Sequence, residues 1–310
     1  NTRGIIPNVS TMHNPRSTEA AIGYFLTQAA ASAMILFSSR INAWQTGTWN
    51  ITDLSYGPAH ILLTMGLEMK LGLAPTHFWL PEVLQGSTLT TALIITTWQK
   101  LAPVAVIYMT LNNLSTTALI LLGLLSSIIG GWGGLNQTQT RKIMAFSSIA
   151  HLGWMISIAS IMPNIMILNL MIYMIMTTAL FYSLILSKSK TVQDTTATWT
   201  LSPTLTITMM ILLLSLGGLP PLTGFMPKWL ILEELVAQNL TPIATIMAMS
   251  ALLSLFFYLR LTYTTTLTLS PNTAQTKFKW RFKPNHATLL MGASSTVTIF
   301  LLPMAPLVLL

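Results

Sequence analysis

The stretch from Leu213 to Glu234 constrains the fold most, because it begins as an apolar helix, is interrupted, and resumes. Two glycines and two prolines within residues 217–221 loosen and then end the first helix. Pro227 stands where the first turn of a second helix tolerates proline, and Lys228 follows it directly. A lysine within a bilayer costs about 2.5–3.5 kcal/mol on insertion scales, and non-helical backbone persists there only under protein or water. The interruption and the charge therefore indicate one functional feature inside a membrane.

A second interruption upstream repeats this pattern. Residues 72–82 read GLAPTHFWLPE, and residues 218–228 read GLPPLTGFMPK. Both begin with Gly-Leu, both have prolines six residues apart, and in both a charged residue follows the last proline. Lys70 stands just before the upstream interruption. Two interrupted helices in corresponding positions of two halves indicate a transport site where the halves meet.

The composition is that of a membrane protein. Of the 310 residues, 52% are hydrophobic and only 7% are charged, whereas a soluble domain is about 25% charged. The apolar stretches are continuous rather than alternating, which excludes a transmembrane β-barrel. Because the sequence contains no cysteine, it excludes disulfides, thiolate metal sites and cysteine-ligated iron–sulfur clusters within this chain. The net charge of +8 is not gathered on a solvated domain, so no nucleic-acid partner is expected.

Apolar stretches of about 20 residues predict an all-α polytopic membrane protein with about nine transmembrane helices. The predicted spans are 19–39, 57–85 (interrupted at 74–76), 88–110, 115–134, 142–161, 164–187, 203–237 (interrupted at 217–227), 242–263 and 287–309.

The basic residues test this assignment. Eleven of the 15 lie on the side of the N-terminus: Arg3, Arg16, Arg141, Lys142, Lys188, Lys190, Arg260, Lys277, Lys279, Arg281 and Lys283. Arg40 alone lies on the other side, and Lys70, Lys100 and Lys228 lie inside spans. By the positive-inside rule, the N-terminal side is the cytoplasm, or the matrix in a mitochondrion.

In this topology the two interrupted helices run in opposite directions and are five spans apart, which predicts inverted five-helix repeats. We divide the chain into an N-terminal segment 1–18, a first half 19–187, a second half 188–263 with the broken helix 203–237, a basic loop 264–286, and a C-terminal transmembrane helix 287–310. Because the chain begins with Asn and its first 17 residues lack an apolar core, we expect a truncated or irregular N-terminal segment.

Lys70, Lys100 and Lys228 are the strongest candidates for chemistry. Lys100 lies near the middle of its span, three residues before Pro103, which leaves the carbonyl of Gln99 without its helical partner. A lysine withdrawn from water can exchange its proton near neutral pH, as a solvated lysine cannot. The alternative is that these side chains snorkel to the interface, which their distance from the span ends disfavours.

Glu68 and His151 are weaker candidates. Glu68 stands two residues before Lys70, so the two point to different faces of a helix, and Glu68 serves either proton transfer or a structural pairing. His151 is expected near mid-membrane, where a proton relay and a structurally satisfied histidine are equal alternatives. Structural or entrance roles are favoured for Glu82, Glu233 and Glu234. The glycine-rich residues 130–134 lack the context of a nucleotide loop and indicate close helix packing or a turn.

Six short stretches carry a resemblance to a known family. They read APTHFWLPEV at 74–83, WQKLAP at 98–103, GWGGLNQTQ at 131–139, RKIMAFSS at 141–148, LGGLPPLTGF at 216–225 and PKW at 227–229. Together they closely resemble the NADH-ubiquinone oxidoreductase chain 2 family, which comprises mitochondrially encoded, antiporter-like subunits of respiratory complex I. The resemblance extends from about Asn14 to the C-terminus.

This resemblance implies a translocase subunit that couples NADH-to-ubiquinone electron transfer to proton pumping across the inner mitochondrial membrane. The family's lysines in the first broken helix, the central helix and the second broken helix match Lys70, Lys100 and Lys228. The family binds no redox centre in this subunit, so NADH, FMN, iron–sulfur clusters and ubiquinone are expected in other subunits. The implied partners are other core and accessory subunits, including neighbouring antiporter-like ones, together with lipid, protons and internal water. The N-terminal side would be the matrix, and the C-terminus would face the intermembrane space.

The chain departs from the family pattern at its start. The family usually has further helical sequence before residues 19–39 and an acidic partner for the first lysine, which residues 1–12 do not supply. Residues 66–69 resemble the family's acidic motif but stand on the lysine helix itself, so that role is not carried over to Glu68. Two other function classes stay open: an independent cation/proton antiporter and, less favoured, a structural membrane scaffold that would tolerate apolar residues at the lysine positions.

Overall fold

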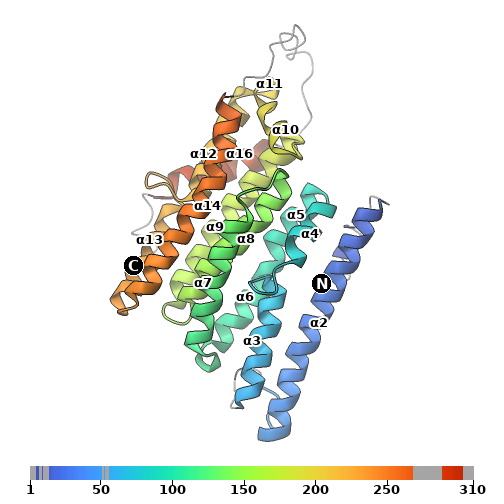
Figure 1. The fold of residues 1–310 in the computed structure, drawn as a ribbon, viewed down its shortest axis with the longest axis vertical. Helices are drawn as coiled ribbons and strands as arrows, with labels where there is room; N and C mark the ends of the chain where they lie inside the picture. Colours follow the sequence, from blue (N-terminus) through green and yellow to red (C-terminus); the bar gives the residue numbers. More distant parts are fainter. Residues whose placement is uncertain are drawn as a thin grey trace.

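The computed structural model describes residues 5–6, 9, 14–50, 52, 56–267 and 288–302, and its regular secondary structure over these ranges is entirely helical. Most of the predicted N-terminal segment 1–18 and nearly all of the predicted basic loop 264–286 lie outside the described residues, and so does the end of the predicted final span. Long helices lie side by side along one axis, with the short helices α10 and α11 at one end (Figure 1).

The helices follow one another without intervening strands in the described part of the chain. They are α2 (Pro15–Thr46), α3 (Gly57–Leu71), α4 (Trp79–Gly86), α5 (Leu89–Thr96), α6 (Trp98–Thr110), the 3₁₀ turn η1 (Leu111–Asn113), α7 (Thr116–Gly133), α8 (Thr140–Ala159), α9 (Pro163–Ser187), α10 (Val192–Thr196), α11 (Thr198–Leu201), α12 (Pro203–Gly217), α13 (Phe225–Ala237), α14 (Thr241–Leu267) and α16 (Thr288–Phe300).

Six helical stretches in the described ranges are long and apolar enough to cross a membrane, which supports a multi-pass protein. They are Pro15–Thr46, Leu89–Asn113, Thr116–Gly133, Thr140–Ala159, Pro163–Ser187 and Thr241–Leu267. The other three predicted spans are not among these six, and the end of the last one, 287–309, lies outside the described residues. Two of them are broken into halves of 8–15 residues, and α16 has 13 residues.

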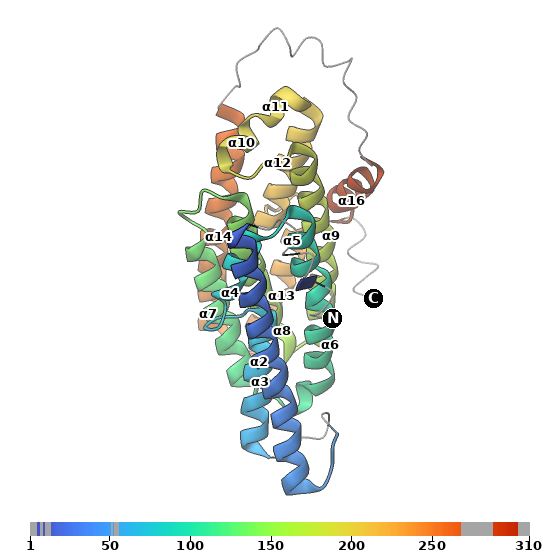
Figure 2. The ribbon, with the colours of Figure 1, turned by 90° about the vertical axis from the view of Figure 1, so that its right-hand side faces the viewer.

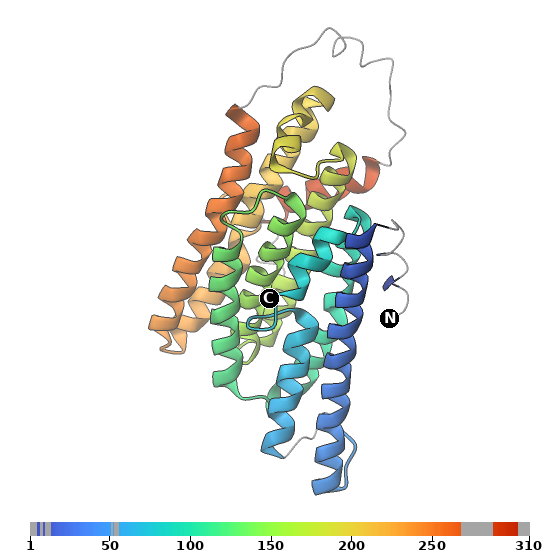
Figure 3. The ribbon, with the colours of Figure 1, turned by 45° about the vertical axis from the view of Figure 1, so that its right-hand side comes forward.

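Glycine rather than proline ends the first half of each broken helix, which corrects the predicted bounds. The gaps are 72–78 and 218–224, instead of 74–76 and 217–227. Gly72 and Gly218 have φ of 73° and 82°, a left-handed conformation that glycine adopts without strain and that commonly closes helices. The two broken helices run in opposite directions, since the chain rises from α3 to α4 and descends from α12 to α13 (Figures 1 and 3).

The predicted span 88–110 is divided at Thr97 into α5 and α6. The sequence suggested a kink beside Gln99, because Pro103 cannot bond the carbonyl four residues before it. In the structure Pro103 lies inside α6, and the interruption occurs two residues upstream of Gln99, where the Thr97 hydroxyl donates to the Leu93 carbonyl at 2.6 Å. Lys100 is thereby placed in the first turn of α6 rather than in mid-helix.

Helix α8 lies at the centre of the bundle, between α7 and α9, and packs against α4, α13 and α14 as well (Figure 2). Of its 20 residues, 17 are buried. Small and apolar side chains occur around its whole circumference, as expected for a helix covered on every side. His151 lies on this helix and is therefore enclosed by protein.

Small residues bring α7 and α8 close together. A Cβ atom on Gly130 would lie 2.5 Å from the backbone nitrogen of Ala150, and one on Gly153 would lie 2.5 Å from the hydroxyl of Ser126. Such approach of two backbones is typical of membrane helix pairs with small residues at the interface. The packing interpretation of residues 130–134 is therefore confirmed.

We predict that Gly130→Ala destabilises this helix pair by about 1–3 kcal/mol, the usual cost of overpacking. The added methyl group meets backbone atoms of Ala150, which cannot move aside as a flexible side chain can. The melting temperature of the solubilised protein in its assembled complex measures the effect. Gly23→Ala is the control, because its added methyl group would meet no atom within 4 Å. An equal melting temperature for both variants would contradict the prediction.

Candidate functional site

Lys228 binds the free end of helix α12. The last carbonyls of a helix have no partner within it, and Gly217 is the last residue of α12. The ammonium of Lys228, in the first turn of α13, donates to the Gly217 carbonyl at 2.8 Å. Lys228 is only 8% exposed, so the gap places a charged group inside the protein. The preceding carbonyl, that of Leu216, interacts with the His151 imidazole. The last two carbonyls of α12, those of Leu216 and Gly217, thus interact with two titratable side chains, His151 and Lys228.

Lys100 makes the equivalent contact at the other broken helix. Its ammonium donates to the carbonyl of Leu71, the residue before Gly72, just as Gly217 stands before Gly218. Lys100 is 1% exposed, and its ammonium lies 5.8 Å from the centroid of the Trp79 ring. The contact therefore combines a carbonyl with an aromatic face.

These two sites are electrostatically alike. Aligned peptide dipoles give the C-terminal end of a helix a partial negative charge, which favours a cation there. Within the described residues, neither Lys100 nor Lys228 has an ion-pair partner. Each buried ammonium is thus held by neutral acceptors, and its charge is not cancelled by a carboxylate.

Lys70 and Glu68 lie in the last turn of α3 but in different surroundings. Lys70 is half-buried, and the described part of the chain gives it no hydrogen-bond partner. Glu68 is 2% exposed, and its carboxylate interacts with the backbone amide of Thr76 across the gap. Its Oε1 atom is buried without a hydrogen bond. The two side chains do not pair, in agreement with their spacing, and Glu68 ties the gap segment to its own helix.

Sequence reasoning missed a hydroxyl cluster around His151. The rings of His151 and Tyr173 lie 5.3 Å apart, and Tyr173 is fully buried on α9. Tyr258 on α14 is buried as well, and neither tyrosine hydroxyl has a well-formed hydrogen bond. Ser148 and Ser147 precede His151 by about one helical turn and lie next to Tyr173 and Tyr258 respectively. The serines inside an apolar span were the available signal. The tyrosines gave none, because the packing of α8 against α9 and α14 was not known.

The candidate residues therefore form two groups. One group joins Lys100 to the end of α3, and the other joins Lys228 and His151 to the end of α12. Glu82 lies apart from both and lines a pocket that also contains His77 and Lys142. Glu233 is exposed and Glu234 half-buried on α13.

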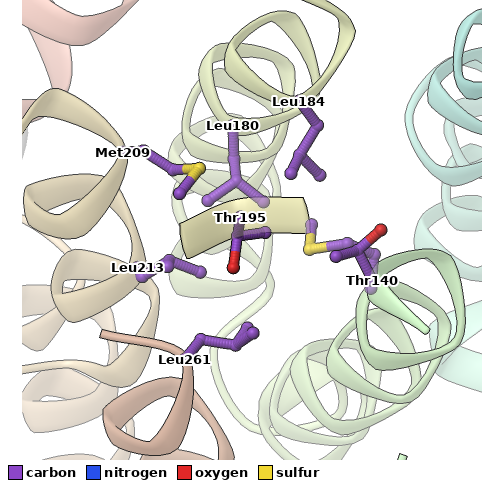
Figure 4. Close-up of a pocket in the computed structure, with 8 residues that line it drawn as sticks. Thr140, Leu180, Leu184, Thr195, Met209, Leu213 and Leu261 are labelled. Atoms are coloured by element: carbon purple, nitrogen blue, oxygen red, sulfur yellow. The ribbon is translucent and has the colours of Figure 1, made fainter. Parts of the chain in front are cut away.

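A small apolar cavity lies between α9, α12 and α14. Figure 4 shows the leucine side chains of α9, α12 and α14 that line it, together with Met209, Thr140 and Thr195. Its volume of about 10 Å³ accommodates at most one water molecule. Within the described ranges, no cluster of three His, Asp or Glu side chains could hold a metal ion. Buried lysine and histidine side chains are groups that can bind and release protons.

Comparison with known proteins places the chain in a family. The family model described as "NADH:quinone oxidoreductase/Mrp antiporter, TM" matches residues 8–254, and the one described as "NADH dehydrogenase subunit 2 C-terminus" matches residues 255–309. The chain is 55% identical to NADH-ubiquinone oxidoreductase chain 2 of Xenopus laevis, over 100% of this chain and 90% of the relative. It is 54% identical to the protein of the same name from Gallus gallus, over 99% of this chain and 89% of the relative.

Solved structures share the fold. A chain of respiratory complex I from Thermus thermophilus with bound aureothin matches 98% of this chain and 72% of its own length, with a TM-score of 0.85 and 27% identity. A chain of the Mrp complex from Dietzia sp. DQ12-45-1b matches with a TM-score of 0.78 and 17% identity, over 95% of this chain and 67% of that one, which shows similarity of fold alone. The two family models together match residues 8–309, and relatives are more than 50% identical along the whole sequence. This chain therefore belongs to the NADH-ubiquinone oxidoreductase chain 2 family.

Proposed function

We propose that this chain is a proton-translocating membrane subunit of respiratory complex I, which couples NADH-to-ubiquinone electron transfer to proton pumping. The observation that carries this conclusion is the pair of buried ammonium groups, Lys100 and Lys228, bound to free carbonyls at the ends of two oppositely directed broken helices. The name of the relatives, at 53–55% identity, favours a redox-driven complex over the alternative of an independent cation/proton antiporter.

In this proposal Lys70, Lys100 and Lys228 form a proton relay, with His151 and internal water between them and Glu68 in a lesser role. A carbonyl stabilises an ammonium group without fixing it as a carboxylate would, so the proton stays exchangeable. Like charges repel strongly where the dielectric constant is low, so a proton arriving at one lysine favours release from the next. The contact between His151 and Leu216 places a further titratable group beside Lys228.

The proposed architecture has nine transmembrane helices arranged as inverted five-helix repeats. The matching geometry of the two gaps supports it, since the second half-helices begin at Trp79 and Phe225, each seven residues after the left-handed glycine. We retain the division into residues 1–18, 19–187, 188–263 with the broken helix 203–237, the loop 264–286 and the final helix 287–310 as part of this proposal.

We further propose that the protein lies in the inner mitochondrial membrane, with its N-terminal side in the matrix and its C-terminus in the intermembrane space. Basic residues near the helix ends on the N-terminal side support this orientation; those described are Arg16, Arg141, Lys142, Lys188, Lys190 and Arg260. The proposed partners are other core and accessory subunits of the complex, including neighbouring antiporter-like ones, together with lipid and internal water. NADH, FMN, iron–sulfur clusters and ubiquinone would bind in other subunits, and this chain would hold no redox centre.

Replacement of the relay lysines tests the proposal. In the assembled complex, Lys228→Met and Lys100→Met should each lower turnover about tenfold or more, equivalent to about 1.4 kcal/mol on the barrier, and lower the proton-to-electron ratio. Lys228→Arg should assemble but not pump, because a guanidinium keeps its charge and does not release its proton. Proton uptake and NADH oxidation in reconstituted vesicles measure both quantities. Unchanged turnover and stoichiometry in all three variants would refute the relay.

The contact between Lys228 and Gly217 can be tested separately. A methyl group on residue 218 would lie 2.9 Å from the Lys228 ammonium. The alanine backbone would also have to keep the left-handed φ of 82° that Gly218 has. Gly218→Ala should therefore displace the ammonium and slow pumping several-fold. Gly217→Ala is the matched control, because its methyl group would meet no atom closer than 3.7 Å. Equal pumping rates in these two neighbouring variants would show that the contact is unimportant.

A further inference from the structure

A second polar pocket, outside the proposed relay, lies at the end of the bundle where α2, α5 and α8 begin and α4 and α9 end. Its volume is about 490 Å³. Four basic side chains line it: Arg16, Arg141, Lys188 and Lys190. Three of them are exposed, and Arg141 is half-buried. None of the four belongs to the proton relay. The positive-inside rule explains on which side of the membrane they lie, but not why they line a single pocket.

The charges in this pocket are not balanced by protein carboxylates. Among the described residues, no acidic side chain lines the pocket, and Arg16 and Arg141 are close enough to repel each other. Asp194 is the carboxylate that interacts with Lys190, but its oxygen accepts from the backbone amides of Lys190 and Thr191 at 3.0 and 2.8 Å. Partial burial would raise the pKa of Asp194, but these hydrogen bonds lower it overall. One engaged carboxylate leaves the pocket with an excess of positive charge.

The backbone adds to this excess. Helices α2, α5 and α8 have no acidic residue in their first turn, so no carboxylate offsets the partial positive charge of their N-terminal ends. The Thr88 hydroxyl oxygen accepts from the Thr91 amide of α5, and the Thr140 amide of α8 donates to the Lys190 carbonyl. Neutral side chains with amide or hydroxyl groups complete the lining, among them Asn14, Gln85, Thr88, Thr90 and Gln139. Cations, helix N-termini and neutral donors together form a site for phosphate oxygens.

The position of the pocket identifies the source of the phosphate. The helix ends around it are the ends of membrane spans, which lie at the level of lipid headgroups. Further along α2, Ile22 and Leu26 are each 60% exposed, about 9 and 15 Å from Arg16 along the helix axis. Leu89 and Ile185 contribute apolar atoms to the pocket itself. Basic side chains at the headgroup level, next to exposed apolar side chains of α2, match the phosphate and the acyl chains of a lipid. A soluble anion would use only the basic side chains.

We propose that this pocket binds the headgroup of an anionic phospholipid from the leaflet on the N-terminal side of the membrane. The phosphate lies among Arg16, Arg141, Lys188 and Lys190, and the acyl chains extend along the apolar surface of α2. Basic pockets between membrane helices bind anionic headgroups in this way in other membrane proteins. The site is independent of the relay and would hold a lipid in a complex that does not pump.

The test uses the assembled complex, delipidated and placed in nanodiscs of phosphatidylcholine with or without phosphatidylglycerol. Native mass spectrometry measures the phosphatidylglycerol retained after extraction from the discs. The Arg16→Gln, Lys188→Gln double variant should bind it about twenty-five-fold more weakly, about fivefold for each basic residue. It leaves Arg141 intact, which also donates to the Ser87 carbonyl. The control is Lys142→Gln, because Lys142 lines the neighbouring pocket beside Glu82 instead.

Three outcomes would overturn the proposal. The first is equal retention of phosphatidylglycerol by the double variant and the control. The second is displacement of that lipid by millimolar inorganic phosphate, which would indicate a site for free anions. The third is protection of Arg16 and Lys188 from chemical labelling in discs of phosphatidylcholine alone, which would indicate that a protein partner covers the pocket. Selective loss of phosphatidylglycerol from the double variant, together with resistance to phosphate, supports it.

Discussion

The structure depends on one interaction: a lysine ammonium bound to the free carbonyl at the end of a half-helix inside the membrane. An interrupted helix leaves carbonyls unpaired where no bulk water can satisfy them, and a buried ammonium lacks its hydration shell. Burying either the carbonyl or the ammonium alone would cost free energy, and a hydrogen bond between them satisfies both. Lys228 makes this bond to the Gly217 carbonyl, and Lys100 makes it to the Leu71 carbonyl. The interruption and the charge are therefore mutually dependent, and neither is a defect that the fold merely tolerates.

The central position of α8 explains why these contacts can persist. Burial on every side keeps lipid and bulk solvent away from His151, and close approach to α7 leaves no room for rearrangement at that interface. The Leu216 carbonyl meets His151 because α12 and α13 break beside this helix. Close packing against α7 fixes the position of α8, and the gap between α12 and α13 leaves backbone carbonyls without helical partners beside it. The site around His151 is therefore held in place while these carbonyls remain able to accept hydrogen bonds from side chains.

Much of the fold could be predicted from the sequence, because glycine, proline and charge interrupt otherwise apolar stretches at few places. The two breaks and their opposite directions followed from those residues and from the loop charges. The bounds did not, since Gly72 and Gly218 close the helices before the prolines are reached. The partners of Lys100 and Lys228 were also beyond reach, because an acceptor that is a backbone carbonyl has no side-chain signature in sequence. The tyrosines near His151 were missed for a related reason, since their proximity arises from helix packing.

The two ammonium contacts are alike in chemistry but differ in what holds them. Lys228 belongs to the broken helix whose carbonyl it binds, so its contact depends on the geometry of the gap between α12 and α13. Lys100 comes from α6 and binds the end of α3, so its contact depends on how two separate helices pack. A change within the second gap would alter the Lys228 contact alone, whereas a shift of α6 against α3 would alter the Lys100 contact alone. Similar gaps thus hold two ammonium groups whose contacts can change separately. In the proposed relay, the lysines would then interact through their charges rather than through a shared structural change.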